Sequence, residues 1–176
     1  MKIDYYLEKN DFLLFQLYTA SKSVRIKRKK IRSWILLTLG SIFFTFYFHL
    51  DNSQFLTYYF LFCSFLVGFF FPKYFKWRYK KHYLKNIKEH YSNRFGIETT
   101  LEFTDAGIHT KDKTGESKIN ISEVEIVNET MYHYFIKISS GMSLIIPKSK
   151  ITEPKILMKQ FEKMKLSINK ELNWKW

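Results

Sequence analysis

Two long uncharged apolar runs, separated by only four residues, constrain this chain more than any other feature. The first run covers residues 33–50 and the second covers residues 55–71; neither contains Lys, Arg, Asp or Glu. At a rise of about 1.5 Å per residue, each run makes a helix of roughly 26 Å, close to the roughly 30 Å hydrocarbon core of a membrane. Two core helices of a soluble protein would each need a polar stripe, and neither run has one. The sequence therefore predicts two transmembrane helices.

The formal charge of the chain is +13, and nearly all of it flanks these two runs. Residues 1–32 have a net charge of +6 and residues 72–96 of +7, whereas residues 97–176 have only +1. Because Lys and Arg are enriched on the cytoplasmic side of membrane helices, we expect both termini in the cytoplasm. The basic residues expected to contact the membrane surface and its anionic headgroups are Arg25, Lys27, Arg28, Lys29, Lys30, Arg32, Lys73, Lys76, Arg78, Lys80 and Lys81.

Small residues predict where the two helices of the hairpin touch. In lipid no hydrophobic force drives helices together, so close approach at small side chains is the expected contact. Four such residues fall at matching depth on either side of the turn: Gly40, Ser41, Ser64 and Gly68. The spacing of Ser64 and Gly68 could equally serve a homo-oligomer. The single cysteine, Cys63, excludes a disulfide framework.

The residues after the second run change from helical to alternating periodicity. Residues 73–96 have a helical apolar stripe of Leu84, Ile87, Tyr91 and Phe95, with Gly96 as terminator. About six short strands follow, within residues 101–104, 108–111, 119–121, 124–126, 132–138 and 144–146. A last helix is expected from a Thr152 cap, with an apolar face of Leu157, Phe161, Met164 and Ile168. This order is typical of a small antiparallel β domain plugged by a helix, in the manner of a pleckstrin-homology-like domain.

The N-terminal residues alternate as a strand would. Ile3, Tyr5 and Leu7 are separated by polar or aromatic residues, so residues 2–7 are hypothesised to add a strand to the same sheet, before a helix that starts at Asp11. The predicted fold class is an α+β integral membrane protein. Its predicted parts are an N-terminal strand and basic amphipathic helix (1–32), a first transmembrane helix (33–50), an extracytoplasmic turn (51–54), a second transmembrane helix (55–72), a basic juxtamembrane helix (73–96) and a cytoplasmic β domain with a C-terminal helix (97–176).

Arrangements that catalysis requires are missing from the sequence. No HExxH, CxxC, Walker-type glycine loop or GxSxG elbow occurs. Asp105 suits a turn better than an acid or base, and His109 and His133 suit surface or partly buried strand positions better than metal ligands. We therefore expect no enzyme activity and no cofactor or metal.

Four segments carry a resemblance to a known family. They are NDFLLFQLYTASKS (Asn10 to Ser23), LEFTDAGI (Leu101 to Ile108), SKINISEVEIVNET (Ser117 to Thr130) and SLIIPKSKI (Ser143 to Ile151). In this order, around two closely spaced apolar helices, the chain resembles the YcxB-like bacterial membrane proteins. The resemblance implies a membrane hairpin in the bacterial inner membrane with a cytoplasmic pleckstrin-homology-like domain, and it carries over no biochemical activity.

Three functions stay open from these patterns. The first is an interaction module that docks an unknown protein or a lipid headgroup at the cytoplasmic domain. The alternative is a protective or immunity-type membrane protein that acts against membrane-active agents. Nucleic-acid binding is disfavoured because residues 97–176 are nearly neutral, and such binding depends on neutralising phosphates.

Overall fold

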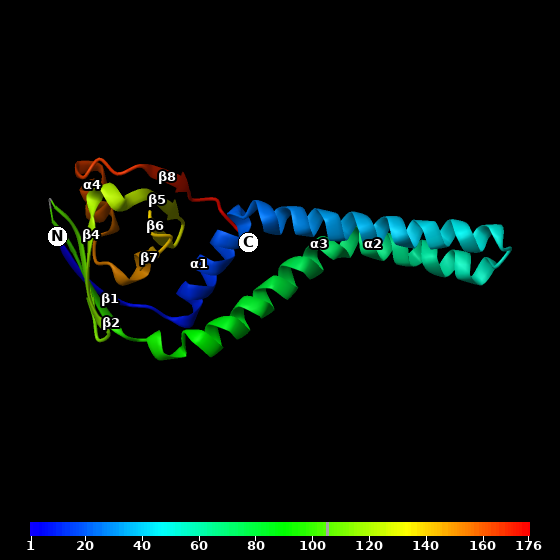
Figure 1. Cartoon of the computed structure of the whole chain (residues 1–176), viewed down its shortest axis with the longest axis horizontal. Coiled ribbons are helices and arrows are strands. Elements are labelled where there is room, and N and C mark those ends of the chain that lie inside the picture. Colours follow the sequence, from blue (N-terminus) through cyan, green and yellow to red (C-terminus); the bar gives the residue numbers. More distant parts are fainter. Residues whose placement is uncertain (105) are drawn as a thin grey trace. The chain divides into compact units, whose positions relative to one another are not determined.

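A computed structural model describes residues 1–104 and 106–176 and divides them into two compact units (Figure 1). Asp105, for which a turn role was predicted, lies outside the described residues. The first unit combines residues 1–16 with residues 85–175, and the second comprises residues 17–84 together with Trp176. The folded domain therefore consists of two chain segments, one before and one after a helical insertion. This differs from the predicted domain of residues 97–176, which left the N-terminal residues outside.

Two long helices make up most of the second unit. Helix α2 spans Val24–Leu50 and helix α3 spans Gln54–His90; both are long and apolar enough to cross a membrane. The side chain of Ser23 caps α2 by accepting a hydrogen bond from the Ile26 N–H at 3.3 Å. No residue of either apolar window is buried, so neither window has the environment of a soluble core. The predicted helix of residues 73–96 is the second part of α3, and it ends at His90 rather than Gly96.

Aromatic side chains make the contacts found between α2 and α3. The ring of Phe60 stacks on those of Phe44 and Phe48, with centroids 5.3 Å apart in each pair. A methyl group added at Gly40 or Gly68 would meet no atom within 4 Å. Ser41 and Ser64 donate their hydroxyl hydrogen bonds to carbonyls of their own helices. At Gly68 the two helices are joined by a hydrogen bond, which the Trp34 indole N–H donates to the Gly68 carbonyl at 3.2 Å.

Four antiparallel strands form the first sheet of the domain. Their order is β1-β2-β3-β4, with bounds Lys2–Tyr6, Glu98–Phe103, Gly107–Asp112 and Gly115–Asn120. Strand β1 pairs with β2 so that Lys2 lies opposite Glu102, which confirms the hypothesis of an added N-terminal strand. Gly107 is required where β3 begins, because a Cβ atom there would lie 2.2 Å from the carbonyl oxygen of Ile119.

The second sheet has the order β7-β6-β5-β8, with bounds Ser143–Pro147, His133–Ile138, Val124–Thr130 and Ile168–Glu171. The six predicted strands are confirmed as β2 to β7. Strand β8 is parallel to β5, with Ile168 opposite Val127. Ile168 was predicted on the last helix, and this was wrong: α4 spans Pro154–Lys163, and the left-handed backbone of Lys165 (φ 54°) turns the chain before β8. Short 3₁₀ helices occupy Ser92–Arg94, Ile121–Glu123 and Lys148–Lys150.

Helix α4 joins the inner faces of the two sheets. Its Phe161 is fully buried and contacts Phe103 of β2 and Tyr134 of β6, with ring centroids 5.7 and 5.6 Å apart. Burying one such ring contributes about 1.5–3 kcal/mol, so this residue couples both sheets to the helix. Thr152 does not cap α4, because Glu153 occupies the cap position and makes no side-chain cap bond. Pro154 begins the helix where its missing N–H costs nothing.

The opposite face of the second sheet is covered by the start of helix α1, which spans Lys9–Lys22. Phe135 alternates with Tyr134 along β6 and therefore points away from α4. Its ring lies 5.4 Å from that of Phe15, and Phe12 packs on Tyr91 at 5.3 Å. The second sheet is therefore buried on both faces, and the first residues of α1 are part of the domain core.

Candidate interaction site

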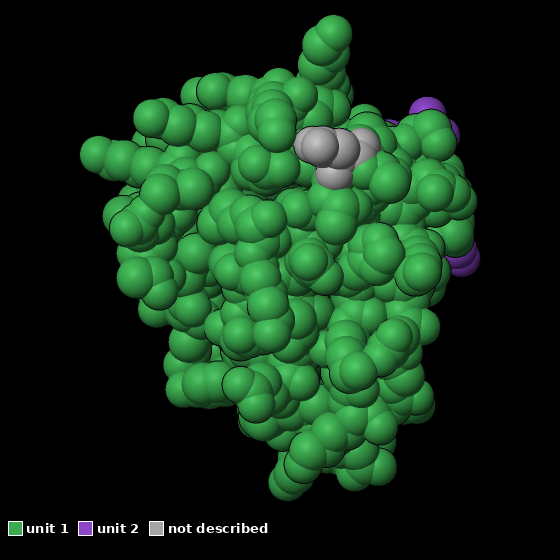
Figure 2. All heavy atoms as spheres, turned by 90° about the vertical axis from the view of Figure 1, so that its left-hand side faces the viewer, with its two compact units in different colours: residues 1–16, 85–175 green, residues 17–84, 176 purple. Residues whose placement is uncertain are grey.

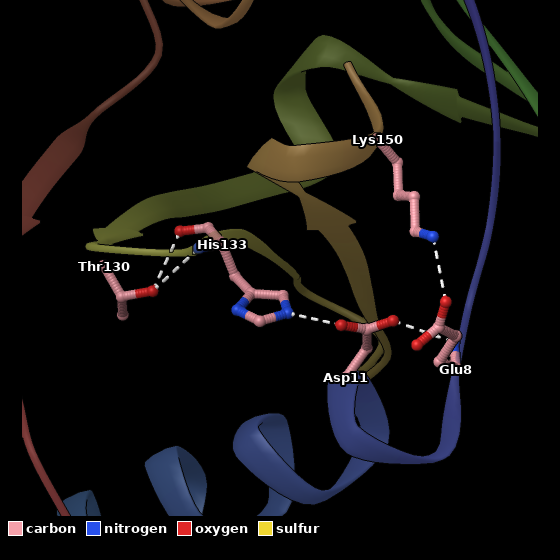
Figure 3. Close-up of polar contacts among 5 residues, drawn as sticks. All are labelled: Glu8, Asp11, Thr130, His133 and Lys150. Atoms are coloured by element: carbon pink, nitrogen blue, oxygen red, sulfur yellow. Dashed lines mark hydrogen bonds and ion pairs between the residues drawn. The ribbon is translucent and has the colours of Figure 1, made fainter.

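A buried carboxylate–imidazole pair fastens α1 to the second sheet (Figure 3). The Oδ1 atom of Asp11 lies 2.8 Å from Nε2 of His133, at the start of β6. The side chains are 12% and 5% exposed, respectively. The two residues are 122 positions apart, so the contact can form only after the chain has folded. His133 was predicted to be a surface or partly buried residue, and the structure corrects this: α1 covers it.

Helix α1 starts at Lys9, two residues before the predicted start at Asp11, and Asp11 caps its first turn. Its Oδ2 atom accepts a hydrogen bond from the Glu8 N–H at 2.8 Å, which is the backward half of a capping box. Burial raises the pKa of Asp11, but the hydrogen bonds from His133 and from the Glu8 N–H outweigh it, so the net pKa lies below the ordinary value. The carboxylate is therefore ionised at neutral pH, and one side chain both caps the helix and attaches it to the sheet.

The surroundings of His133 indicate a structural contact. Thr130 Oγ1 accepts from the His133 N–H at 3.1 Å and donates to the His133 carbonyl at 3.0 Å (Figure 3). The imidazole ring stacks on Phe135 with an interplanar angle of 11°. The Thr130 hydroxyl therefore bonds to the backbone of His133 and not to its ring. The Asp11–His133 pair joins α1 to the second sheet.

A second ion pair closes the other side of the same junction. Lys150 Nζ lies 2.9 Å from Glu8 Oε1 (Figure 3). It also lies 2.6 Å from the hydroxyl of Tyr6 and over the Tyr6 ring. Hydrogen bonds to Glu8 and then to Tyr6 raise the pKa of Lys150. The segment after β7 is thereby tied to the loop between β1 and α1.

A third pair, more buried than the Lys150–Glu8 pair, lies between β5 and the end of β7. Lys148 Nζ lies 2.7 Å from Glu129 Oε1, and the side chains are only 18% and 11% exposed. Lys148 also lies over the ring of Tyr134. Burial, followed by the charge of Glu129, raises the pKa of Tyr134 to about 12. Among residues 1–104 and 106–176, no group of three or more His, Cys, Asp or Glu side chains could hold a metal ion.

A groove runs beside β1, the outermost strand of the first sheet. It has a volume of about 450 Å³ and is lined by Met1, Lys2, Ile3, Asp4, Lys150, Ile151, Thr152, Glu153 and Ile156. The end of this unit that carries the N-terminus faces the viewer in Figure 2. The groove thus combines a strand edge, with its backbone hydrogen-bonding groups, and apolar side chains from the approach to α4. An edge of this kind accepts an added strand.

The predicted membrane-contact residues lie on the two long helices and are not part of this groove. Those from Arg25 to Arg32 are on the first turns of α2, and those from Lys73 to Lys81 follow Pro72 on α3. All are exposed except Lys30, which is half-buried. Lys73 and Lys81 lie over the rings of Phe69 and Trp77.

Sequence reasoning missed the Asp11–His133 pair and the groove. His133 and Phe135 lie on the same face of β6. Nothing in the neighbouring sequence indicates that α1 covers that face. The groove depends on which strand lies at the edge of the sheet. For the groove, the alternation at residues 2–7 was the one available signal.

A comparison with protein families bears on the second half of the chain. A family model described as YcxB-like protein matches residues 103–164. This stretch is similar to the YcxB-like family. The YcxB-like stretch begins at the last residue of β2 and ends just after α4, so it includes His133 and Lys150 but neither β1 nor α1. Neither a curated protein nor a solved structure matched the chain.

Proposed function

We propose that this protein is anchored in the bacterial inner membrane by α2 and α3, with both termini in the cytoplasm, and that its YcxB-like domain docks a protein or a lipid headgroup there. The domain is pleckstrin-homology-like in its use of two sheets and one helix, and its role is binding and not catalysis. The observation that carries the proposal is a folded domain in which β1 is an edge strand, joined to two helices whose apolar windows are not buried among the described residues.

Charge supports the proposed orientation. The basic clusters lie on the first turns of α2 and on the part of α3 beyond Pro72, while the connection between the helices carries only Asp51. This asymmetry favours a cytoplasmic location for both basic ends. At about 1 kcal/mol per basic residue near an anionic surface, the two clusters would also hold the helix ends against the headgroups.

The polar contacts support docking over catalysis. The three ion pairs join separate segments of the domain, and each of their carboxylates is held by a side chain of the same domain. The groove beside β1 offers backbone groups and apolar side chains, which are the means by which edge strands bind extended partners.

The orientation is tested with single cysteines in the full chain, after Cys63→Ser has removed the native thiol. A membrane-impermeant maleimide added to intact spheroplasts should label Asn52→Cys, in the turn between α2 and α3. It should not label Thr114→Cys, between β3 and β4, until the membrane is opened. Labelling of Thr114→Cys in intact spheroplasts would overturn the proposed orientation.

Docking is tested by crosslinking the full chain in cells, followed by detergent extraction and mass spectrometry of recovered proteins and lipids. Asp4→Pro removes one edge N–H, and Asp4→Ala is the matched control that keeps it. We expect a partner that is recovered with the unchanged chain and with Asp4→Ala but lost with Asp4→Pro. Identical recovery with all three chains would contradict docking at this edge.

A further inference from the structure

We propose that the β1 edge pairs with the β1 edge of a second copy of this chain, antiparallel, with Lys2 of each copy opposite Asp4 of the other. The inference rests on the proposed docking function, since it names the docked partner. The resulting dimer would contain one continuous sheet of strands contributed equally by two domains.

The register of β1 determines which backbone groups are offered to a partner. Met1 and Phe103 exchange two hydrogen bonds, of 2.9 and 2.7 Å between nitrogen and oxygen. In an antiparallel ladder such pairs alternate with pairs that are not hydrogen-bonded. Met1, Ile3 and Tyr5 therefore direct their N–H and C=O groups toward β2. Lys2, Asp4 and Tyr6 direct theirs outward, at the free edge.

Charge selects one register for two identical edges. Strands related by a two-fold axis could place Lys2 opposite Lys2, or Asp4 opposite Asp4, and like charges directly opposite one another are destabilising. Placing Lys2 opposite Asp4 of the second copy creates an attractive pair, and the symmetry creates it twice. Both side chains are exposed, at 62% and 46%; within one chain Lys2 Nζ lies 4.0 Å from Asp4 Oδ2, and Thr100 donates a hydrogen bond to Asp4. The charges of this edge thus disfavour other pairings and allow this one.

The groove accommodates the inward side chains of such a pair. In this register Ile3 of one copy lies opposite Ile3 of the other, at the two-fold axis. Both side chains are on the face of the sheet that lines the groove. Ile3 is half-buried against the core and lines the groove together with Ile156, which is 49% exposed. Pairing would therefore cover apolar surface as well as satisfy backbone groups.

Two differently tagged full-length chains test the charge register. A Lys2→Asp chain has two acidic residues at the edge and an Asp4→Lys chain has two basic residues. Two copies of the same variant would place like charges opposite each other. A mixed pair would place opposite charges there. When both are co-expressed and solubilised, we expect mixed pairs to exceed either like pair by roughly tenfold, as expected for two reversed cross-strand charge pairs. Equal recovery of mixed and like pairs would overturn the proposal.

Disulfide trapping tests the geometry in membranes, again with Cys63→Ser as background. Opposed residues of a pair that is not hydrogen-bonded have Cα atoms about 4.5 Å apart, within the range that a disulfide spans. Oxidation should therefore crosslink Ile3→Cys to itself. Asp4→Cys is the matched control, since it lies opposite Lys2 and should not crosslink. Crosslinking of Asp4→Cys alone, or of neither variant, would overturn the register.

The two proposals fail separately. If the edge-dependent partner in the Asp4→Pro experiment is another protein or a lipid, and the charge variants show no preference, docking stands and self-pairing is overturned. If Ile3→Cys crosslinks but Thr114→Cys is labelled in intact spheroplasts, self-pairing stands and the cytoplasmic orientation is overturned.

Discussion

Asp11 shows at the scale of one residue how this domain joins distant parts of its chain. One carboxylate oxygen caps α1 through the Glu8 N–H and the other binds His133, so helix initiation and tertiary attachment depend on the same group. Removing one partner of a buried pair leaves the other without compensation, which costs more than the pair contributes when intact. The Glu8–Lys150 pair nearby is more exposed and should matter less.

Asp11→Asn should lower the free energy of unfolding by about 1–3 kcal/mol at neutral pH, since the amide keeps the shape but loses the charge-assisted bond. The folded-state pKa of Asp11 is depressed, so its stabilisation is present above the ordinary aspartate value of about 3.9 and is lost as pH falls through the folded value. The difference in free energy of unfolding between the variant and the unchanged chain should become smaller in that acidic range. Thermal unfolding of both detergent-solubilised chains measures this difference. Glu8→Gln is the control, and an equal loss in both variants would contradict this role for Asp11.

At the scale of elements, α2 and α3 show what residue type alone can and cannot predict. The extent of each apolar helix follows from its composition, but its contact face does not. Small residues were expected at that face. The rings of Phe44, Phe48 and Phe60 lie there, and the Trp34 indole N–H reaches the carbonyl of Gly68. A methyl group added at Gly40 or Gly68 would meet no atom within 4 Å.

Phe60→Ala should therefore weaken the α2–α3 hairpin by about 1–3 kcal/mol, through the loss of two stacked contacts and their packing. Gly68→Ala should leave its stability unchanged or slightly raised, because the added methyl meets open space and alanine favours helix. Unfolding of the full chain by titration from mild detergent into dodecyl sulfate, followed by helical circular dichroism, distinguishes the two. A larger loss in Gly68→Ala than in Phe60→Ala would indicate close backbone approach at the glycine.

At the scale of the whole molecule, the domain is assembled from two chain segments separated by the helices. Residues 1–16 supply the edge strand β1 and the cover on the second sheet, although the YcxB-like match begins only at Phe103. Without them, β2 would become an unpaired edge, and Phe135 and His133 would be exposed. The folded unit therefore depends on residues that lie before the first apolar helix.

A fragment of residues 97–176 should consequently be less stable than one in which a flexible Gly/Ser linker joins residues 1–16 to residues 85–175. We expect cooperative thermal unfolding for the linked chain, and aggregation or a clearly lower melting temperature for the fragment, because exposed edges and apolar faces promote association. Calorimetry and light scattering of both proteins check this. Equal melting temperatures would show that the N-terminal segment adds nothing to the domain.

The amino-acid sequence by itself determined the two apolar helices, their basic flanks and the six strands β2 to β7. These depend on local periodicity and composition, which are present in any short window of the chain. It also indicated β1, because alternation is local, and the pairing of β1 with β2 was a hypothesis that the register confirmed.

Tertiary structure alone decided the remaining features. The Asp11–His133 contact joins residues 122 positions apart, and β8 forms because the chain turns at Lys165 and finds an open edge on β5. The face of β6 that carries His133 looks like a solvent face in sequence, and it is buried because α1 lies on it. Such features depend on which elements meet, and that is set by the packing of the whole domain and not by the preferences of any one segment.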